Sequence, residues 1–317
     1  MPTPRLPAEL MGGAFTVECA ARHGVSARML QGREWRRLLR GVYCHRGVAI
    51  DDEIRLSAAR LALPDDAVAA GRLAAWLHGV WSPPPGGQLP LEWAREKGRS
   101  RPLRALAGSH RLVVDDADVV EVRGLRCTSP MRTAFQLMRG APLVEAVVVA
   151  EAFAWGGVLE MPWLWAYVDA HHRWPGVERT RRALDFVKNG VRSPGESRLR
   201  MVAVLGGLPE PLVNLPVERD RELLGVLDLY LLGRRPAGAE YDGAYHESDE
   251  QRSADNRREN RITIETGLPV LRYDRRSLSR HRARERVLWE MARATGVEPR
   301  NILDPRWFSD PRRPFRW

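Results

Sequence analysis

Gly225-Val226-Leu227-Asp228-Leu229-Tyr230-Leu231-Leu232 is an apolar stretch with a single carboxylate at its centre. Its length and its aliphatic and aromatic residues predict a buried β-strand over residues 223–232. A carboxylate is costly to bury inside such a strand unless it is hydrogen-bonded or binds a cation. Asp228 is therefore the first candidate site residue, and a hydrogen-bonded structural role is the alternative for it.

The residues on either side extend this pattern into a sheet. Residues 212–218 predict a preceding strand, and a charged turn at 219–221 joins the two strands into a hairpin. Ala239-Glu240-Tyr241-Asp242-Gly243 predicts a third, short strand. Because side chains alternate along a strand, Glu240 and Asp242 share one face, and His246 follows after a turn.

These side chains together indicate metal chemistry on a phosphodiester. Clustered carboxylates repel one another unless a cation neutralises them, and Mg²⁺ or Mn²⁺ favours carboxylate and water ligands. Such an ion activates water and stabilises a leaving oxygen. We therefore expect Asp228, Glu240 and Asp242 to bind the metal. His246 would act as a general acid or base, or hold a phosphate.

A helix is expected just before the hairpin. Ser193-Pro194-Gly195-Glu196 combines a serine cap, a proline in the first turn and a glutamate three residues after the serine, which predicts a helix over 196–205. The helix ends at Gly206. Glu196 has two interpretations, as a helix cap or as a further carboxylate of the site.

Arginines follow the candidate site along the chain. Residues 255–266 predict a helix, 269–273 predict a strand, and 275–286 form a dense basic run. The arginines of that helix that we expect to contact nucleic acid are Arg257, Arg258 and Arg261. For the basic run, a grip on the phosphate backbone and a solvated helix face are both open.

The first fifty residues predict a helix–turn–helix followed by a wing. Thr16 can cap a helix over 17–22, and Ser26 can cap a second helix that extends toward Trp35. Residues 36–44 mix arginines with strand-forming residues, as a wing would. The second helix of such a motif enters the major groove while arginines hold phosphates. The expected DNA contacts are Arg28, Arg33, Arg36, Arg37 and Arg40. A purely structural helical hairpin is the alternative.

The composition of the chain favours a polyanionic partner. The 317 residues carry a formal net charge of +10, and only two of the 50 basic residues are lysines. A basic protein of this kind suggests nucleic acid, although a GC-rich genome would also favour arginine codons. The three scattered cysteines are interpreted as reduced thiols of a cytoplasmic protein. No secretion signal is predicted, and the apolar stretch 141–168 is interrupted by charges, so no membrane span is predicted.

The C-terminal motifs resemble a known family. Ser193-Pro194-x-Glu196, Val226-Leu227-Asp228, Glu240-Tyr241-Asp242-Gly243-x-x-His246, Asp255-x-x-Arg258 and Val270-Leu271-Arg272-Tyr273 resemble the domain related to very-short-patch-repair (Vsr) endonucleases of the PD-(D/E)XK superfamily. The resemblance implies a mixed sheet flanked by helices. It implies Asp228 as the central metal ligand and Glu196 on the preceding helix, with Glu240, Asp242 and His246 completing the site. The lysine usual in the superfamily is absent, and Vsr-like members use histidine, so His246 would substitute.

The N-terminal two thirds is similar to actinobacterial proteins with an AbiEi-type antitoxin N-terminal domain. The residues that carry this similarity are Gly24-Val25-Ser26, Trp35-Arg36-Arg37, Arg40-Gly41-Val42-Tyr43 and Thr128-Ser129-Pro130-x-Arg132-Thr133-Ala134. The resemblance implies a winged helix at the start of the chain. It also implies a regulator linked to phage defence and toxin control.

These observations predict an α/β, multi-domain protein. We expect a winged helix at 1–50, a mostly helical middle with a small β insert at 51–190, a Vsr-like nuclease domain at 191–295 and a tail at 296–317. The expected function is DNA binding with Mg²⁺- or Mn²⁺-dependent cleavage or nicking, in DNA repair or phage defence. The alternative is an antitoxin-like regulator with a degenerate nuclease fold and a toxin or repair partner, and RNA processing is a third option.

Overall fold

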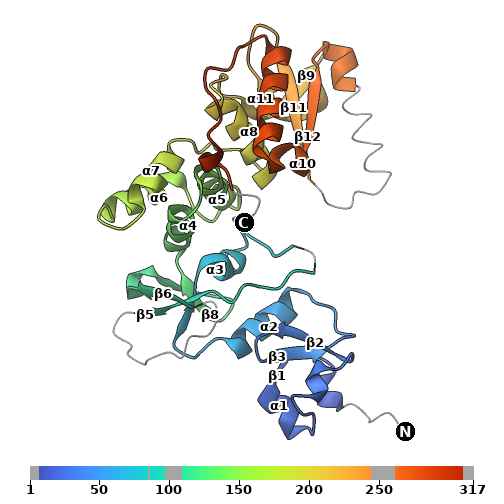
Figure 1. The fold of residues 1–317 in the computed structure, drawn as a ribbon, viewed down its shortest axis with the longest axis vertical. Coiled ribbons are helices and arrows are strands. Elements are labelled where there is room, and N and C mark those ends of the chain that lie inside the picture. Colours follow the sequence, from blue (N-terminus) through green and yellow to red (C-terminus); the bar gives the residue numbers. More distant parts are fainter. Residues whose placement is uncertain (1–6, 85, 97–108, 244–260, 310–317) are drawn as a thin grey trace. The chain divides into compact units, whose positions relative to one another are not determined.

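The computed structural model describes residues 7–84, 86–96, 109–243 and 261–309 (Figure 1). The chain divides into two compact units, Met1–Thr133 and Ala134–Trp317. Both contain helices and sheets, so the predicted α/β class is confirmed. The predicted boundaries at 50, 190 and 295 are finer than this division and stay predictions. Among the residues that the structure describes, none of the helices is both long and apolar enough to cross a bilayer.

The first unit opens with a small sheet whose strand order is β1-β3-β2. Its elements are η1 (Ala8–Leu10), β1 (Phe15–Thr16), α1 (Val17–Arg22), η2 (Met29–Gln31), β2 (Trp35–Leu39), β3 (Val42–His45) and α2 (Asp52–Ala62). Thr16 caps α1 as predicted, because its Oγ1 accepts a hydrogen bond from the backbone N–H of Cys19 at 3.1 Å. The strand-forming residues after Trp35 form the β2–β3 hairpin, and its role as a wing stays a prediction.

The predicted second helix after Ser26 is wrong. The segment contains only the short 3₁₀ turn η2, and the Ser26 hydroxyl accepts a hydrogen bond from Met29 N at 3.3 Å within that turn. Gly32, a weak helix former, ends the turn in an extended conformation. Trp35 starts β2 instead and is buried edge-on against Phe15, with ring centroids 5.4 Å apart. Core packing of the two aromatic rings therefore decides the local structure.

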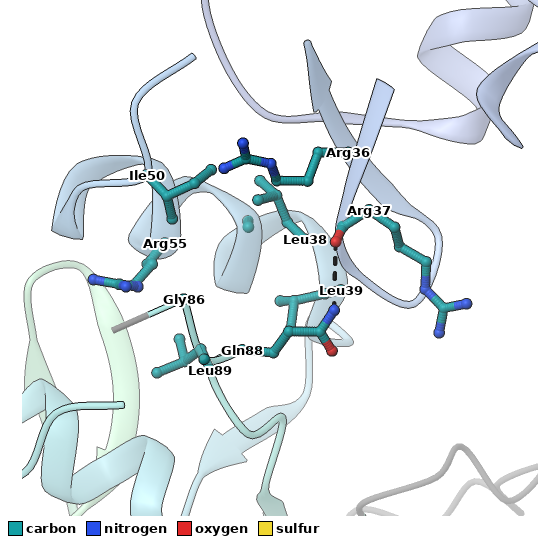
Figure 2. A pocket seen from close by; sticks show the side chains of 11 residues that line it. Arg36, Arg37, Leu38, Leu39, Ile50, Arg55, Gly86, Gln88 and Leu89 are labelled. Atoms are coloured by element: carbon teal, nitrogen blue, oxygen red, sulfur yellow. Dashed lines mark hydrogen bonds between the residues drawn. The ribbon is translucent and has the colours of Figure 1, made fainter. Parts of the chain in front are cut away.

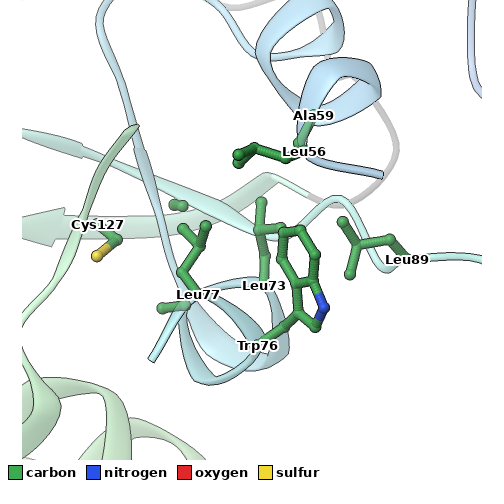
Figure 3. Close-up of a cluster of buried hydrophobic side chains, with 9 residues drawn as sticks. Leu56, Ala59, Leu73, Trp76, Leu77, Leu89 and Cys127 are labelled. Atoms are coloured by element: carbon green, nitrogen blue, oxygen red, sulfur yellow. The ribbon is translucent and has the colours of Figure 1, made fainter. Parts of the chain in front are cut away.

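A second, five-stranded sheet completes the first unit, in the order β6-β5-β4-β8-β7. Its elements are β4 (Ala67–Ala69), α3 (Gly71–Leu77), β5 (Trp93–Glu96), β6 (Ser109–Val114), η3 (Asp116–Asp118), β7 (Val119–Val122) and β8 (Leu125–Thr128). Leu73, Trp76 and Leu77 of α3 pack with Leu56 and Leu89 in a buried cluster (Figure 3). The β content of this region is larger than the small insert that the sequence predicted.

A short strand precedes α3 in the region that was predicted to be mostly helical. Residues 67–69 form β4, and Gly71 adopts φ +56° where the chain turns into α3. A Cβ at Gly71 would lie 2.1 Å from the Glu92 carboxylate, which accepts a hydrogen bond from Arg72 N at 2.7 Å. Only glycine tolerates both the left-handed backbone and this close approach.

The second unit joins a group of helices to a four-stranded mixed sheet (Figure 1). The elements are α4 (Pro130–Arg139, which begins in the first unit), α5 (Leu143–Trp155), α6 (Met161–Ala170), α7 (Val177–Leu184), α8 (Pro194–Leu205), β9 (Leu212–Arg219), β10 (Glu222–Leu231), β11 (Ala237–Asp242), β12 (Val270–Asp274), α10 (Arg275–Ser279), α11 (His281–Thr295) and η4 (Pro305–Trp307). Residues 261–266 are also helical. The strand order is β12-β11-β10-β9, with β12 parallel to β11 and the other pairs antiparallel. Helices α8 and α11 pack against this sheet.

Buried ion pairs fasten α5 to α8. The Arg198 guanidinium donates to both oxygens of Glu145, at 2.9 and 2.7 Å. The Arg200 guanidinium, almost fully buried, donates to Glu151 at 2.7 Å. Burial raises the pKa of Glu151, and the neighbouring Arg200 charge opposes that rise. The helices before residue 190 thus belong structurally with the C-terminal sheet.

Candidate functional site

Asp228 lies half-buried in β10 beside the neighbouring strand β11. The two strands pair from Leu231↔Ala237 to Leu229↔Ala239. Next to this pairing, Oδ2 of Asp228 accepts a hydrogen bond from the backbone N–H of Tyr241 at 2.8 Å. The carboxylate inside the apolar strand is therefore hydrogen-bonded, as the structural alternative requires. Its donor, Tyr241, lies between Glu240 and Asp242 in the sequence.

Glu240 and Asp242 both lie near the guanidinium of Arg272. Arg272 of β12 stands in register with Glu240, which is buried, and its Nη2 lies 3.4 Å from Oε2 of that residue. Its Nη1 lies 3.9 Å from Oδ2 of the exposed Asp242. The predicted common face of the two carboxylates is consistent with this shared partner. Arg272 already offsets part of the repulsion that the sequence argument assigned to a metal ion.

Glu196 sits in the first turn of α8, buried against the sheet. The cap prediction is confirmed, because Ser193 Oγ accepts from Glu196 N at 3.1 Å. The Glu196 carboxylate in turn accepts from Arg192 N at 2.9 Å and from Nδ2 of Asn214 at 2.8 Å. Ser193 is therefore the cap of the helix, whereas the Glu196 carboxylate joins the backbone just before the helix to strand β9.

Asn214 connects Glu196 to the position of Asp228. The neighbouring pairs Val213↔Leu229 and Leu215↔Leu227 place Asn214 opposite Asp228 across β9 and β10. Its φ of +47° is uncommon for a residue other than glycine, and its amide also donates to Gly190 O at 2.9 Å. The polar residues consequently form a line across all four strands, from the Glu196–Asn214 pair through Asp228 to Arg272.

Sequence reasoning gave no role to Asn214 or Arg272. The signal for Asn214 was available, since it is a polar residue between Val213 and Leu215 in a predicted strand, as Asp228 is in the next one. Arg272 was part of the quoted strand motif, but its partners depend on the parallel register of β12 with β11. Local pattern does not determine that register.

The ring of Tyr241 packs against the start of α8. A Cβ at Gly195 would lie 2.0 Å from Cδ1 of the Tyr241 ring, so only glycine permits this approach. Burial raises the pKa of the Tyr241 hydroxyl, and the Arg198 charge opposes the rise. The first turn of α8, with Glu196, is therefore fixed against β11.

The donor chemistry of the three carboxylates suits a hard divalent cation. In the described part of the chain, however, no three His, Cys, Asp or Glu side chains are grouped so that they could hold a metal ion. His246, Arg257 and Arg258 lie outside the described residues. The described side chains therefore do not form a ready-made metal site.

The other predicted nucleic-acid contacts are exposed. Arg261 pairs with Glu222, its Nη2 lying 2.6 Å from the carboxylate. In the first unit, Arg33 pairs with the adjacent Glu34 at 3.3 Å. The remaining exposed arginines of that group are Arg28, Arg36, Arg37 and Arg40. The last three belong to the β2–β3 hairpin and its turn, so positive charge is concentrated there.

The resemblances to Vsr-like nucleases and to AbiEi-type antitoxins rest on short sequence motifs alone, and they stay predictions. The geometry described above is compatible with a mixed sheet flanked by helices in the second unit. Comparison with protein-family models, with curated proteins and with solved structures found no match to the chain.

Proposed function

We propose that the protein binds DNA and that its C-terminal sheet carries a metal-dependent site for cleaving or nicking phosphodiester bonds. The observation that supports this most is the placement of Asp228 and the Glu240–Asp242 pair on adjacent strands. Glu196 is hydrogen-bonded to Asn214 on β9, the strand on the other side of Asp228. Helix α8, the β9–β10 hairpin, β11 and the parallel strand β12 follow the order expected of a Vsr-like PD-(D/E)XK domain at 191–295.

In this proposal Asp228, Glu240 and Asp242 hold Mg²⁺ or Mn²⁺. When bound, such an ion supplies an activated water and neutralises charge on the phosphate. Arg272 supplies the local positive charge in the structure described here, so the ion competes with its guanidinium for the two carboxylates. Glu196 and Asn214 hold the first turn of α8 and strand β9 in place beside them.

DNA binding is proposed for the β2–β3 hairpin, as the wing of a winged helix at 1–50. Because η2 is only three residues long, the hairpin arginines carry the expected phosphate contacts rather than a long recognition helix. Each phosphate contact contributes about 0.9 to the slope of log K against log salt concentration. The triple variant Arg36→Gln, Arg37→Gln, Arg40→Gln should bind duplex DNA more weakly and with a slope reduced by about 2 to 3.

Fluorescence anisotropy over a salt series measures that slope. Arg22→Gln, which removes an exposed arginine at the end of α1, is the matched control and should bind as wild type does. Equal affinity of wild type and triple variant at every salt concentration would remove the hairpin from the DNA interface.

A second proposal is an antitoxin-like transcriptional regulator without chemistry, acting with a toxin or repair partner. The specific observation that favours it is the hold of Arg272 on Glu240 and Asp242. Incubation with supercoiled plasmid, with Mg²⁺, Mn²⁺ or a chelator, separates the two proposals. Nicked or linear product that depends on the metal supports the nuclease. Intact plasmid in a sample that binds DNA supports the regulator.

A further inference from the structure

A pocket of about 370 Å³ lies within the first unit, between β2, the start of α2 and the segment around residue 87 (Figure 2). Its volume falls at the lower end of the range for small-molecule sites. The side chains and backbone that line it are Arg36, Arg37, Leu38, Leu39, Ile50, Arg55, Ala58, Gly86, Gly87, Gln88 and Leu89. The hydrogen bond from Gln88 Nε2 to Arg37 O, at 3.4 Å, joins one wall to the other.

The charge of this lining is entirely positive. Arg36, Arg37 and Arg55 line it together with apolar and uncharged residues, and no acidic side chain does. Arg36 and Arg37 form no ion pair with any residue in the described ranges. Figure 2 shows the Arg36 side chain extending from β2 toward Ile50, whereas the Arg37 guanidinium points the other way.

Arg55 is the most constrained of the three arginines. Its side chain is only 19% exposed, and its Nη1 lies 3.2 Å from Asp52 at the start of α2. Its Nε is buried and has no hydrogen-bond partner among the described atoms. A buried donor without an acceptor is unfavourable, and an anionic oxygen in the pocket would supply the acceptor.

The rest of the lining is aliphatic. Leu39 and Ala58 belong to one buried cluster and Leu89 to another, and the half-buried Leu38 and Ile50 complete the apolar surface. No aromatic side chain lines the pocket, so it offers no ring on which a nucleobase could stack. The lining therefore suits a ligand with an aliphatic body and one anionic head.

We propose that this pocket binds a small organic anion whose carboxylate or phosphate head contacts Arg36 and Arg55 and whose aliphatic chain packs on the leucines. Guanidinium groups match the planar oxygens of carboxylates and phosphates and bind them with charge-assisted hydrogen bonds. Arg36 is also a proposed DNA contact, so the binding is measured without DNA. Failure of this proposal thereby stays distinct from failure of the DNA-binding proposal.

Isothermal titration calorimetry of the full chain tests the site with hexanoate and hexyl phosphate as probes. Uncharged 1-hexanol and inorganic phosphate are the comparators that lack the head or the chain. Both amphipathic anions should bind at one site, and each comparator should bind at least about tenfold more weakly. 1-Hexanol lacks the charged head that the arginines would bind, and inorganic phosphate lacks the aliphatic chain that would pack on the leucines.

Three variants locate the site. Arg36→Gln and Arg55→Gln should each weaken hexyl phosphate binding about tenfold. Ile50→Glu should abolish binding, because the glutamate would place in the pocket a negative charge that repels the anionic ligand. Arg22→Gln, outside the pocket, should bind as wild type, and circular dichroism checks that each variant is folded. The proposal is overturned if neither hexanoate nor hexyl phosphate binds, or if 1-hexanol binds as tightly as they do. It is also overturned if Arg36→Gln and Arg55→Gln bind hexyl phosphate as tightly as wild type does. A further contrary result would be that Arg36→Gln and Arg55→Gln weaken the binding of a short duplex DNA but not that of the small anions.

Discussion

Two clusters in the second unit each pair an arginine with two carboxylates, but they differ in burial and in the length of the contacts. Between α5 and α8, Arg200 and Glu151 are each only 1% exposed, and the Arg200 guanidinium lies 2.7 Å from Glu151 and 2.6 Å from Glu210. Between β11 and β12, Arg272 lies 3.4 Å from Glu240 and 3.9 Å from Asp242, whose side chain is 53% exposed. The first cluster centres on a fully buried pair, whereas the second is looser and more exposed. In our proposal a metal ion would compete with Arg272 for the second cluster.

The largest expected effect is on stability, from Arg200→Met. This variant leaves Glu151 buried without its counter-charge, and breaking a buried pair in this way costs about 3–5 kcal/mol. The matched variant Arg272→Met should cost less, because the Arg272 contacts are longer and one of its two carboxylates, Asp242, is 53% exposed. Urea unfolding followed by circular dichroism measures both. Equal losses in the two variants would remove the distinction between the clusters.

A smaller effect is expected on metal affinity, from Arg272→Gln. Without the guanidinium, the negative charges of Glu240 and Asp242 are no longer offset by Arg272. Mn²⁺ should therefore bind this variant about tenfold more tightly than it binds wild type. Arg282→Gln, which removes an exposed arginine of α11, should leave the affinity unchanged. Calorimetric titration with Mn²⁺ gives both values, and unchanged or weaker binding by Arg272→Gln would argue that Arg272 does not compete with a metal.

The smallest effect concerns Asp274, a carboxylate two residues from Arg272 with a purely structural contact. Its Oδ1 accepts from Ser277 N at 2.8 Å in a capping box of α10, and this hydrogen bond lowers the pKa of Asp274 below its usual 3.8. Asp274→Ala should cost about 1 kcal/mol.

The pH dependence of that loss follows from the direction of the pKa shift. A lowered folded-state pKa stabilises the fold above pH 3.8, and the contribution is lost as the pH falls through the folded value. Urea unfolding at pH 7 should therefore separate Asp274→Ala from wild type, whereas unfolding near pH 3 should bring them closer. A difference that grows on acidification would contradict the cap assignment.

Local pattern predicted the elements that bury one continuous face. The apolar run around Asp228 gave β10 to within one residue at each end. The Ser193 cap of α8 was also predictable, because it depends on residues three apart in sequence. The placement of Asp228 and of the Glu240–Asp242 pair on adjacent strands followed from the hairpin and the short strand after it.

Tertiary contacts decided what the sequence could not predict. Trp35 leaves a helical pattern for β2 because its ring packs on Phe15, and the short strand β4 exists only through its pairing with β5 and β8. The partners of Arg272 depend on a parallel register between strands separated by a long segment of chain. The sequence therefore pointed to Asp228, Glu240 and Asp242 as candidate metal ligands, but it did not reveal that Arg272 lies beside two of them.

The most direct test of the central claim compares wild type with Asp228→Asn on supercoiled plasmid and on mismatched or branched duplexes, with Mg²⁺ and with Mn²⁺. Asparagine retains an oxygen that can accept the Tyr241 N–H, so fold and DNA affinity should persist while the negative charge is lost. We predict metal-dependent cleavage by wild type that falls below detection in Asp228→Asn. Wild-type protein that binds DNA but cleaves no substrate more than Asp228→Asn does would contradict the nuclease proposal and leave the regulator.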